Sequence, residues 1–218
     1  MSEVNNHPPN ILIQGLGFVG SAMAVAVASK LDRKKDPIFN VTAVDLSTKV
    51  GKYRVDCINS GTFPFNNNDT LLCDELKKAI ERGNLKATHS KEAFSNANIV
   101  LVTINCDLVK QNGREEIAMD HFSDSMREIA ENISEDTLVI IESTVPPGTC
   151  EKIVYPLFQN IFNKRKLNIK SFYLAHSYER VMPGDEYFDS IINYWRVYSG
   201  INQDSADKCE AFFSQIIN

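Results

Sequence analysis

Three glycines near the amino terminus are the first residues whose spacing indicates a chemistry. Gly15, Gly17 and Gly20 form a G-x-G-x-x-G pattern between an apolar β-rich run and a helical pattern. The first glycine allows a tight turn, the second lets the backbone approach a pyrophosphate, and the third permits close packing of helix on strand. The free N–H groups of the helix start favour phosphate. The pattern predicts a dinucleotide site, and we assign Phe18 and Val19 to the same cofactor loop.

An acidic residue ends the next β-rich run. Val-Thr-Ala-Val-Asp finishes at Asp45, whose carboxylate could accept hydrogen bonds from an adenosine ribose diol. Asp45 lies further along than the usual spacing of about 20 residues, and residues 31–40 supply a plausible loop insertion. The alternative is a turn or helix N-cap that includes Ser47. Because a carboxylate repels a 2′-phosphate, the sequence favours NAD over NADP.

The elements that must position these residues alternate along the chain. We expect strands at residues 11–14, 41–45, 99–104, 137–142, 171–175 and 196–199, and helices at 18–31, 69–82, 117–132, 148–162 and 205–217. Several strands lack polar alternation, as expected where helices cover both faces of a sheet. The pattern predicts an α/β fold, Rossmann-like and doubly wound, with a mainly parallel sheet. Ligands of such sheets bind at the carboxyl ends of the strands.

The composition excludes several classes of protein. The 218 residues are 43% hydrophobic with a net charge of −5, which is typical of a globular chain and not of a nucleic-acid-binding protein. Five cysteines without a C-x-x-C pair fit neither a disulfide framework nor a zinc ribbon, and they favour reduced thiols. The four histidines are scattered, so we expect no metal site: His7, His89, His121 and His176.

The apolar stretch at residues 11–28 is long enough to suggest a signal peptide or a membrane span. The ten residues before it contain no Lys or Arg, and its three glycines suit a strand and turn better than a lipid-facing helix. We therefore expect no membrane partner and a cytoplasmic location.

Five segments resemble the UDP-glucose/GDP-mannose dehydrogenase family, the NAD-dependent nucleotide-sugar 6-dehydrogenases. They are GLGFVG at 15–20, INSG with Pro64 at 58–64, IESTVPPGT at 141–149, ERVMPG at 179–184, and RV with Gly200 at 196–200. The fourth is similar to the form found in enzymes that act on UDP-N-acetylhexosamines. The likeness spans nearly the whole chain.

The resemblance implies a reaction used in polysaccharide biosynthesis. A UDP-hexose or UDP-N-acetylhexosamine is oxidised at its C6 alcohol to the uronic acid with two NAD, through an aldehyde and a cysteine thioester. Thr144 would hold water beside the nicotinamide, Glu179 would act as acid and base, and Arg180 would contact the substrate. Asn105, Cys106, Ser143 and Thr144 would line the cofactor site.

Some positions depart from the family pattern or allow other roles. Cys106 follows Asn105 where the family has Thr-Pro, and Lys49 stands one position early for a ribose contact. Without the resemblance, Ser143 and Thr144 could cap the next helix, and Glu179 and Arg180 could be a surface pair. Cys106 and Cys150 are alternative nucleophiles, although a passive role is favoured for both.

The family's cysteine motif, the lysine and asparagine of its central helix, and its nucleotide-sugar domain all come after the region matched here. No segment of this sequence matches them, so we expect residues 1–218 to be the NAD-binding domain, with the central helix possibly starting near 203–218. Such a chain would bind NAD without turnover and would form the family's homodimer only with the central helix. The alternatives are another Rossmann dehydrogenase, of the 6-phosphogluconate or hydroxyacyl-CoA type, and a stand-alone dinucleotide-binding module.

Overall fold

The computed structural model describes residues 7–217 except 107, 112–113, 118 and 180–183, and only the backbone between 108 and 117. Its main sheet has seven strands in the order β3 (Leu85–Thr88), β2 (Asn40–Val44), β1 (Asn10–Gln14), β4 (Ile99–Val102), β7 (Leu138–Ile141), β8 (Tyr173–His176) and β9 (Ser199–Gly200). The first six are parallel, and β9 runs antiparallel to β8. This order confirms the Rossmann-like fold, with the strand order reversing between β1 and β4.

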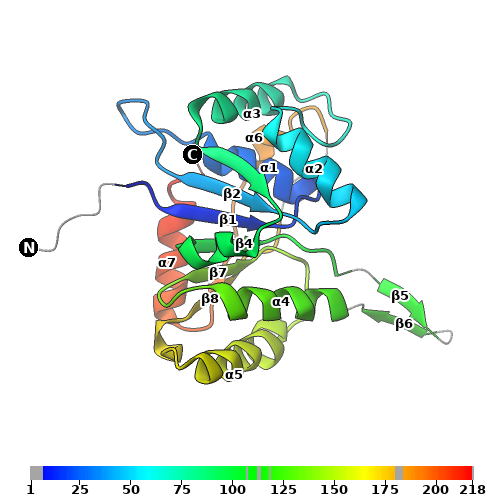
Figure 1. Cartoon of the computed structure of the whole chain (residues 1–218), viewed down its shortest axis with the longest axis vertical. Coiled ribbons are helices and arrows are strands. Elements are labelled where there is room, and N and C mark those ends of the chain that lie inside the picture. Colours follow the sequence, from blue (N-terminus) through cyan, green and yellow to red (C-terminus); the bar gives the residue numbers. More distant parts are fainter. Residues whose placement is uncertain (1–6, 107, 112–113, 118, 180–183, 218) are drawn as a thin grey trace, which may run out of the picture.

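Helices cover both faces of the sheet (Figure 1). One face carries α1 (Phe18–Ala28), α2 (Lys49–Asn59), α3 (Thr70–Arg82), α6 (Tyr187–Asn193) and α7 (Gln203–Phe213). The other carries the 3₁₀ helix η1 (Lys91–Asn96), α4 (Asp120–Asn132) and α5 (Tyr155–Arg165). A π-helical turn, η2 (Cys150–Val154), leads into α5, and the 3₁₀ turn η3 (Ile169–Ser171) precedes β8.

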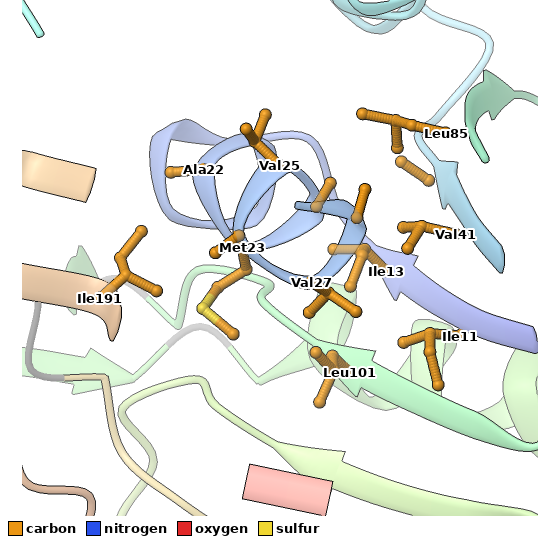
Figure 2. Close-up of a cluster of buried hydrophobic side chains, with 14 of the residues drawn as sticks. Ile11, Ile13, Ala22, Met23, Val25, Val27, Val41, Leu85, Leu101 and Ile191 are labelled. Carbon is orange, nitrogen blue, oxygen red and sulfur yellow. The ribbon is translucent and has the colours of Figure 1, made fainter. Parts of the chain in front are cut away.

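Helix α1 is the most deeply buried helix of the described chain. Every residue from position 20 to 28 is buried, because the helix lies between the sheet and the helices α3 and α6. Val27 packs toward Ile11, Ile13 and Leu101 of the sheet (Figure 2). Each such side chain contributes about 1.5–3 kcal/mol by leaving water. The apolar stretch at 11–28 is therefore a strand and a core helix.

Several regions differ from the sequence expectation. The expected strand at 196–199 is wrong, because β9 covers only Ser199–Gly200. The predicted helix at 117–132 starts at Asp120 instead, after an antiparallel hairpin of β5 (Leu108–Gln111) and β6 (Arg114–Ile117). This hairpin projects from the body beside α4 (Figure 1). The elements α2, β3 and α6 were also not predicted.

Candidate functional site

The glycine loop joins β1 to α1 at the carboxyl edge of the sheet. Gly15 has a φ of +100°, a conformation that L side chains rarely adopt, and its N–H donates to the carbonyl of Val44 at 2.8 Å. Gly17 is the N-cap of α1, with no side chain to satisfy the first N–H groups of the helix. The loop thus presents free backbone donors at a helix N-terminus, the arrangement that binds phosphate.

Gly17 and Gly20 have opposite surroundings. A Cβ on Gly17 would meet nothing within 4 Å, so only open space faces this part of the backbone. A Cβ on Gly20 would lie 2.0 Å from the carbonyl oxygen of Gly15 and 2.4 Å from Oγ1 of Thr103. Gly20 therefore serves the packing of the helix against the loop, whereas Gly17 leaves room for a ligand to approach the backbone.

Asp45 closes the other side of the loop. Its Oδ2 accepts the Leu16 N–H at 3.3 Å, and its Oδ1 accepts the Leu46 N–H at 2.7 Å. Nη1 of Arg54, on α2, lies 3.4 Å from Oδ2. Arg54, and not Lys49, is the cation that the fold brings to this carboxylate. Sequence reasoning missed Arg54, because the contact depends on the unpredicted helix α2.

Two adjoining cavities lie near the glycine loop at the carboxyl edge. The larger, of about 570 Å³, lies over the glycine loop, and among its lining residues are Gln14, Gly15, Gly17, Asp45, Arg54, Thr103, Ile104 and Asn105. The smaller, of about 290 Å³, is lined by Val19, Thr103, Ile104, Asn105, Cys106, Glu142, Ser143, Thr144 and Glu179. They share three lining residues: Thr103, Ile104 and Asn105. The structure thus gathers most of the sequence-predicted site residues in adjoining cavities.

Two of the predicted site residues that the structure describes line neither cavity. Gly20 faces the loop backbone, and the Phe18 ring packs against an aromatic cluster that includes Tyr187, at 4.4 Å between ring centroids. Arg180 lies outside the described residues.

Ser143 links two strand ends. Its hydroxyl accepts the Ile104 N–H at 2.9 Å and lies 3.4 Å from the carbonyl of Val102. The alternative that Ser143 caps the next helix is therefore wrong. That helical segment begins after Thr149, whose hydroxyl donates to the carbonyl of Pro146. Ser143 instead keeps the ends of β4 and β7 in register beside the smaller cavity.

A buried group of charged residues lies at the smaller cavity, which two of its members, Glu142 and Glu179, line. Nη1 of Arg196 lies 3.5 Å from Oε1 of Glu142 and 3.7 Å from Oε1 of Glu179. Glu142 is fully buried, and the side chains of Arg196 and Glu179 are 3% and 12% exposed. Glu179 is thus not part of an exposed surface pair. Glu142 was not predicted as a site residue, although a carboxylate directly after the apolar strand LVII is a sequence signal for one.

The two candidate cysteines occupy different environments. Cys106 lines the smaller cavity with Thr144 and Glu179. Cys150 lines a separate cavity next to His176, and burial raises the pKa of its thiol to about 11. A thiol with so high a pKa holds almost no thiolate near neutral pH and is a poor nucleophile. The structure therefore disfavours Cys150 as an alternative nucleophile.

In the described part of the chain, no helix is long and apolar enough to cross a membrane.

The fold and the loop geometry define a dinucleotide-binding domain of the Rossmann type. The model of the UDP-glucose/GDP-mannose dehydrogenase family, NAD binding domain, matches residues 9–217. The chain belongs to this family, and its cofactor is NAD.

Relatives and solved structures agree with this membership. The chain is 28% identical to UDP-N-acetyl-D-mannosamine dehydrogenase of Pyrococcus horikoshii, over 95% of this chain and 44% of the relative. It is 30% identical to the enzyme of the same name from Methanococcus vannielii, over 95% of this chain and 42% of the relative.

A solved UDP-D-ManNAc dehydrogenase from Pyrococcus horikoshii superposes with a TM-score of 0.79 and 27% identity, covering 96% of this chain and 45% of that one. The NDP-N-acetyl-D-galactosaminuronic acid dehydrogenase of Methanosarcina mazei has the same fold, with a TM-score of 0.86 and 22% identity, over 98% of this chain and 43% of that one. The chain thus spans less than half the length of these proteins.

Proposed function

We propose that this chain is the NAD-binding portion of a nucleotide-sugar 6-dehydrogenase that oxidises the C6 alcohol of a UDP-sugar to the uronic acid with two NAD. The observation that carries the proposal is the placement of Thr144 and Glu179 in the cavity that adjoins the glycine loop. A water-holding hydroxyl and a carboxylate are the groups that the hydrolytic half of this reaction needs beside the nicotinamide.

The described residues fit the cofactor. Open space at Gly17 leaves the backbone free for a pyrophosphate, and a side chain there would fill it. Asp45 would hold the adenosine ribose. The nicotinamide end would lie among Val19, Asn105, Cys106, Ser143 and Thr144. When bound, NAD supplies the hydride acceptor.

The side chains of the smaller cavity divide the remaining work. The Thr144 hydroxyl would orient a water, and Glu179 would take a proton from it as that water attacks the thioester. Arg196, at 3.7 Å, holds the Glu179 carboxylate in place. Arg180, outside the described residues, is proposed to contact the substrate. Among the described residues that line this cavity, Cys106 is the one cysteine that could carry the thioester. We propose that Cys106 is not the nucleophile.

We propose a UDP-N-acetylhexosamine as the substrate, because relatives from Pyrococcus horikoshii and Methanococcus vannielii carry the name UDP-N-acetyl-D-mannosamine dehydrogenase. The domain is proposed to extend over residues 1–218, with the central helix starting near 203–218, where α7 lies. The protein is proposed to act in the cytoplasm and to form a homodimer through that helix.

The test uses this chain joined to the part of the Pyrococcus horikoshii relative that it does not match, where we expect the family's cysteine motif. NADH formation should depend on UDP-N-acetylmannosamine, and UDP-glucose should be the poorer substrate. The variant Glu179→Gln should lose about 10²–10⁴-fold in kcat while keeping NAD affinity, since an amide cannot accept the proton. If hydrolysis is the impaired step, intact mass spectrometry should show an accumulated thioester.

The matched control is Glu151→Gln, which changes an exposed carboxylate outside this cavity and should leave turnover unaltered. No NADH with any nucleotide sugar would refute the proposed reaction. Near-normal turnover of Glu179→Gln would refute the role of Glu179 alone.

A further inference from the structure

Arg196 stands between two carboxylates that come from distant parts of the chain. Glu142 follows β7, Glu179 follows β8, and Arg196 precedes β9. The same guanidinium nitrogen, Nη1, lies 3.5 Å from Glu142 and 3.7 Å from Glu179. Glu142 and Glu179 both line the smaller cavity. One cation is thus shared by two acids at the proposed reaction centre.

The packing around Arg196 keeps it in this position. Its Nη2 lies 3.3 Å from the sulfur of Met23 on α1, and its guanidinium carbon lies 5.5 Å from the centre of the Phe213 ring on α7. A guanidinium held over an aromatic face and excluded from water cannot easily turn away from the two acids.

The other titratable groups that face Glu142 in the described structure are neutral at ordinary pH. They are the Tyr187 hydroxyl on α6 and the Cys209 thiol on α7. Burial raises the pKa of both, and for Cys209 the value is about 12. The charge of the cluster therefore depends on Glu142, Glu179 and Arg196.

These three groups cannot all be charged without cost. With both acids ionised, the buried cluster carries a net charge of −1, which a low-dielectric environment disfavours. Burial, with a further contribution from the charge of Glu179, raises the pKa of Glu142 to about 7 against the opposing effect of Arg196. Glu142 therefore exchanges its proton near neutral pH.

We propose that Glu142 is a positioning residue that sets, through Arg196, how strongly the carboxylate of Glu179 is held. When Glu142 is protonated, the Arg196 guanidinium pairs with the carboxylate of Glu179 alone. When Glu142 loses its proton, Arg196 interacts with both carboxylates, and Glu179 becomes the stronger base. The inference rests on the proposed function, because it assigns a regulator to the base of that reaction.

The sign of the pH effect follows from this geometry. Below about pH 7, Glu142 is neutral, Glu179 is fully paired with Arg196, and proton abstraction is slow. Above about pH 7, the ionised Glu142 competes for Arg196, and the step that depends on Glu179 speeds up. One pKa unit of coupling between the two acids corresponds to about a tenfold change in the proton equilibrium.

The first experiment needs only this chain. Infrared spectroscopy should show the C=O stretch of a protonated carboxyl that disappears as the pH rises through about 7. The band should be missing in Glu142→Gln, which keeps the shape of the side chain. In Glu179→Gln the midpoint should shift to lower pH, because the neighbouring negative charge is gone. The exposed-site variant Glu151→Gln should match the wild type.

The second experiment measures kinetics in the protein that carries the catalytic half. The wild-type kcat should rise across pH 7, and Glu142→Gln should lose this inflection and be up to about tenfold slower at high pH. The KM values for NAD and for the nucleotide sugar should stay unchanged in this variant. A general packing defect would change them as well.

Two results would overturn the inference: no carboxyl titrating near pH 7, or a Glu142→Gln enzyme with the wild-type pH profile. If the joined protein made no NADH at all, the proposed function would fail, and the role of Glu142 as its regulator would fail with it. The infrared titration would still decide whether the two acids share Arg196.

Discussion

At the scale of single residues, we propose that Asp45 determines which dinucleotide the site accepts. Its carboxylate accepts N–H groups from both flanking loops and pairs with Arg54 at 3.4 Å. Arg54 also lies over the Phe65 ring, with its guanidinium carbon 5.3 Å from the ring centre. The site thus holds one acid that suits a ribose diol and one cation that could pair with a phosphate if the acid were removed.

Cofactor preference follows from this pair. The wild-type chain should bind NAD more tightly than NADP, because Asp45 repels a 2′-phosphate. Asp45→Ser should reduce this preference by tenfold or more, about 1.4 kcal/mol, since Arg54 loses its acidic partner and can face the phosphate. Calorimetry with both cofactors measures the effect. The control is Asp56→Ser, an exposed change on α2, the helix that carries Arg54. Equal affinities of the wild-type chain for NAD and NADP would contradict the assignment of Asp45.

The cysteines give a second test at this scale. Cys106 lines the cavity proposed for the nicotinamide, whereas Cys150 lines another cavity and has its pKa raised to about 11 by burial. NAD should therefore slow the alkylation of Cys106 by a small reagent and leave the slow reaction of Cys150 unchanged. Peptide mapping by mass spectrometry separates the two sites. A Cys106 rate that does not respond to NAD would place the nicotinamide elsewhere.

At the scale of elements, the turn from β1 to α1 separates binding from folding. Gly17→Val should abolish NAD binding without lowering the melting temperature much, because a Cβ there meets no protein atom within 4 Å. Gly20→Ala should destabilise the fold by about 1–3 kcal/mol or more, because its Cβ would lie 2.0 Å from a carbonyl oxygen of the loop. Calorimetry and thermal unfolding on both variants measure the two effects. Normal NAD binding by Gly17→Val would make the loop purely structural.

The elements that could be predicted are those that leave a local pattern. The buried runs at β1, β4 and β7 are continuous and apolar, and α3 buries Leu72, Leu76 and Ala79 at helical spacing. The strand β3 alternates over only four residues at the sheet edge, and α6 has seven residues, so neither leaves such a signal. The expected strand at 196–199 failed because Arg196 enters a buried charge cluster instead of a ladder.

The same distinction holds for the site. The glycine loop and Asp45 could be found because spacing along one βαβ unit fixes their geometry. The meeting of Glu142, Glu179 and Arg196 could not be predicted, because it depends on the two connections, β7 to β8 and β8 to β9, that bring separate segments to one edge of the sheet. Local pattern thus predicted the cofactor loop, whereas the tertiary fold was needed to find the charge cluster.

At the scale of the whole molecule, binding and turnover separate. The 218-residue chain should bind NAD but form no NADH with any UDP-sugar. The chain supplies Thr144 and Glu179, but the sequence matches no family cysteine motif. The thiols of Cys150 and Cys209 are poor nucleophiles, because their pKa values are raised to about 11 and about 12. Absorbance of NADH during incubation with NAD and UDP-N-acetylmannosamine measures this. Sustained NADH formation would instead promote Cys106 to a nucleophile.

The stability of the whole fold should depend on pH through Glu142. Its pKa is raised from 4.5 to about 7 in the folded protein, mainly by burial, and unfolding returns it to the ordinary value. The folded state therefore binds this proton more tightly. The associated stabilisation is complete below about pH 4.5 and is lost as the pH rises through 7.

The variant Glu142→Gln has no titratable group at this position, so it should not lose stability through this residue as the pH rises. Relative to the wild type, its free energy of unfolding should rise by up to about 3 kcal/mol between pH 5 and pH 8, since each pKa unit corresponds to about 1.4 kcal/mol. Urea unfolding of both chains at the two pH values measures the difference, and Glu151→Gln, which changes an exposed carboxylate, should show none. A difference between Glu142→Gln and the wild type that stays constant with pH would mean that Glu142 does not change protonation on unfolding. The shared guanidinium of Arg196 would then serve two permanently charged acids.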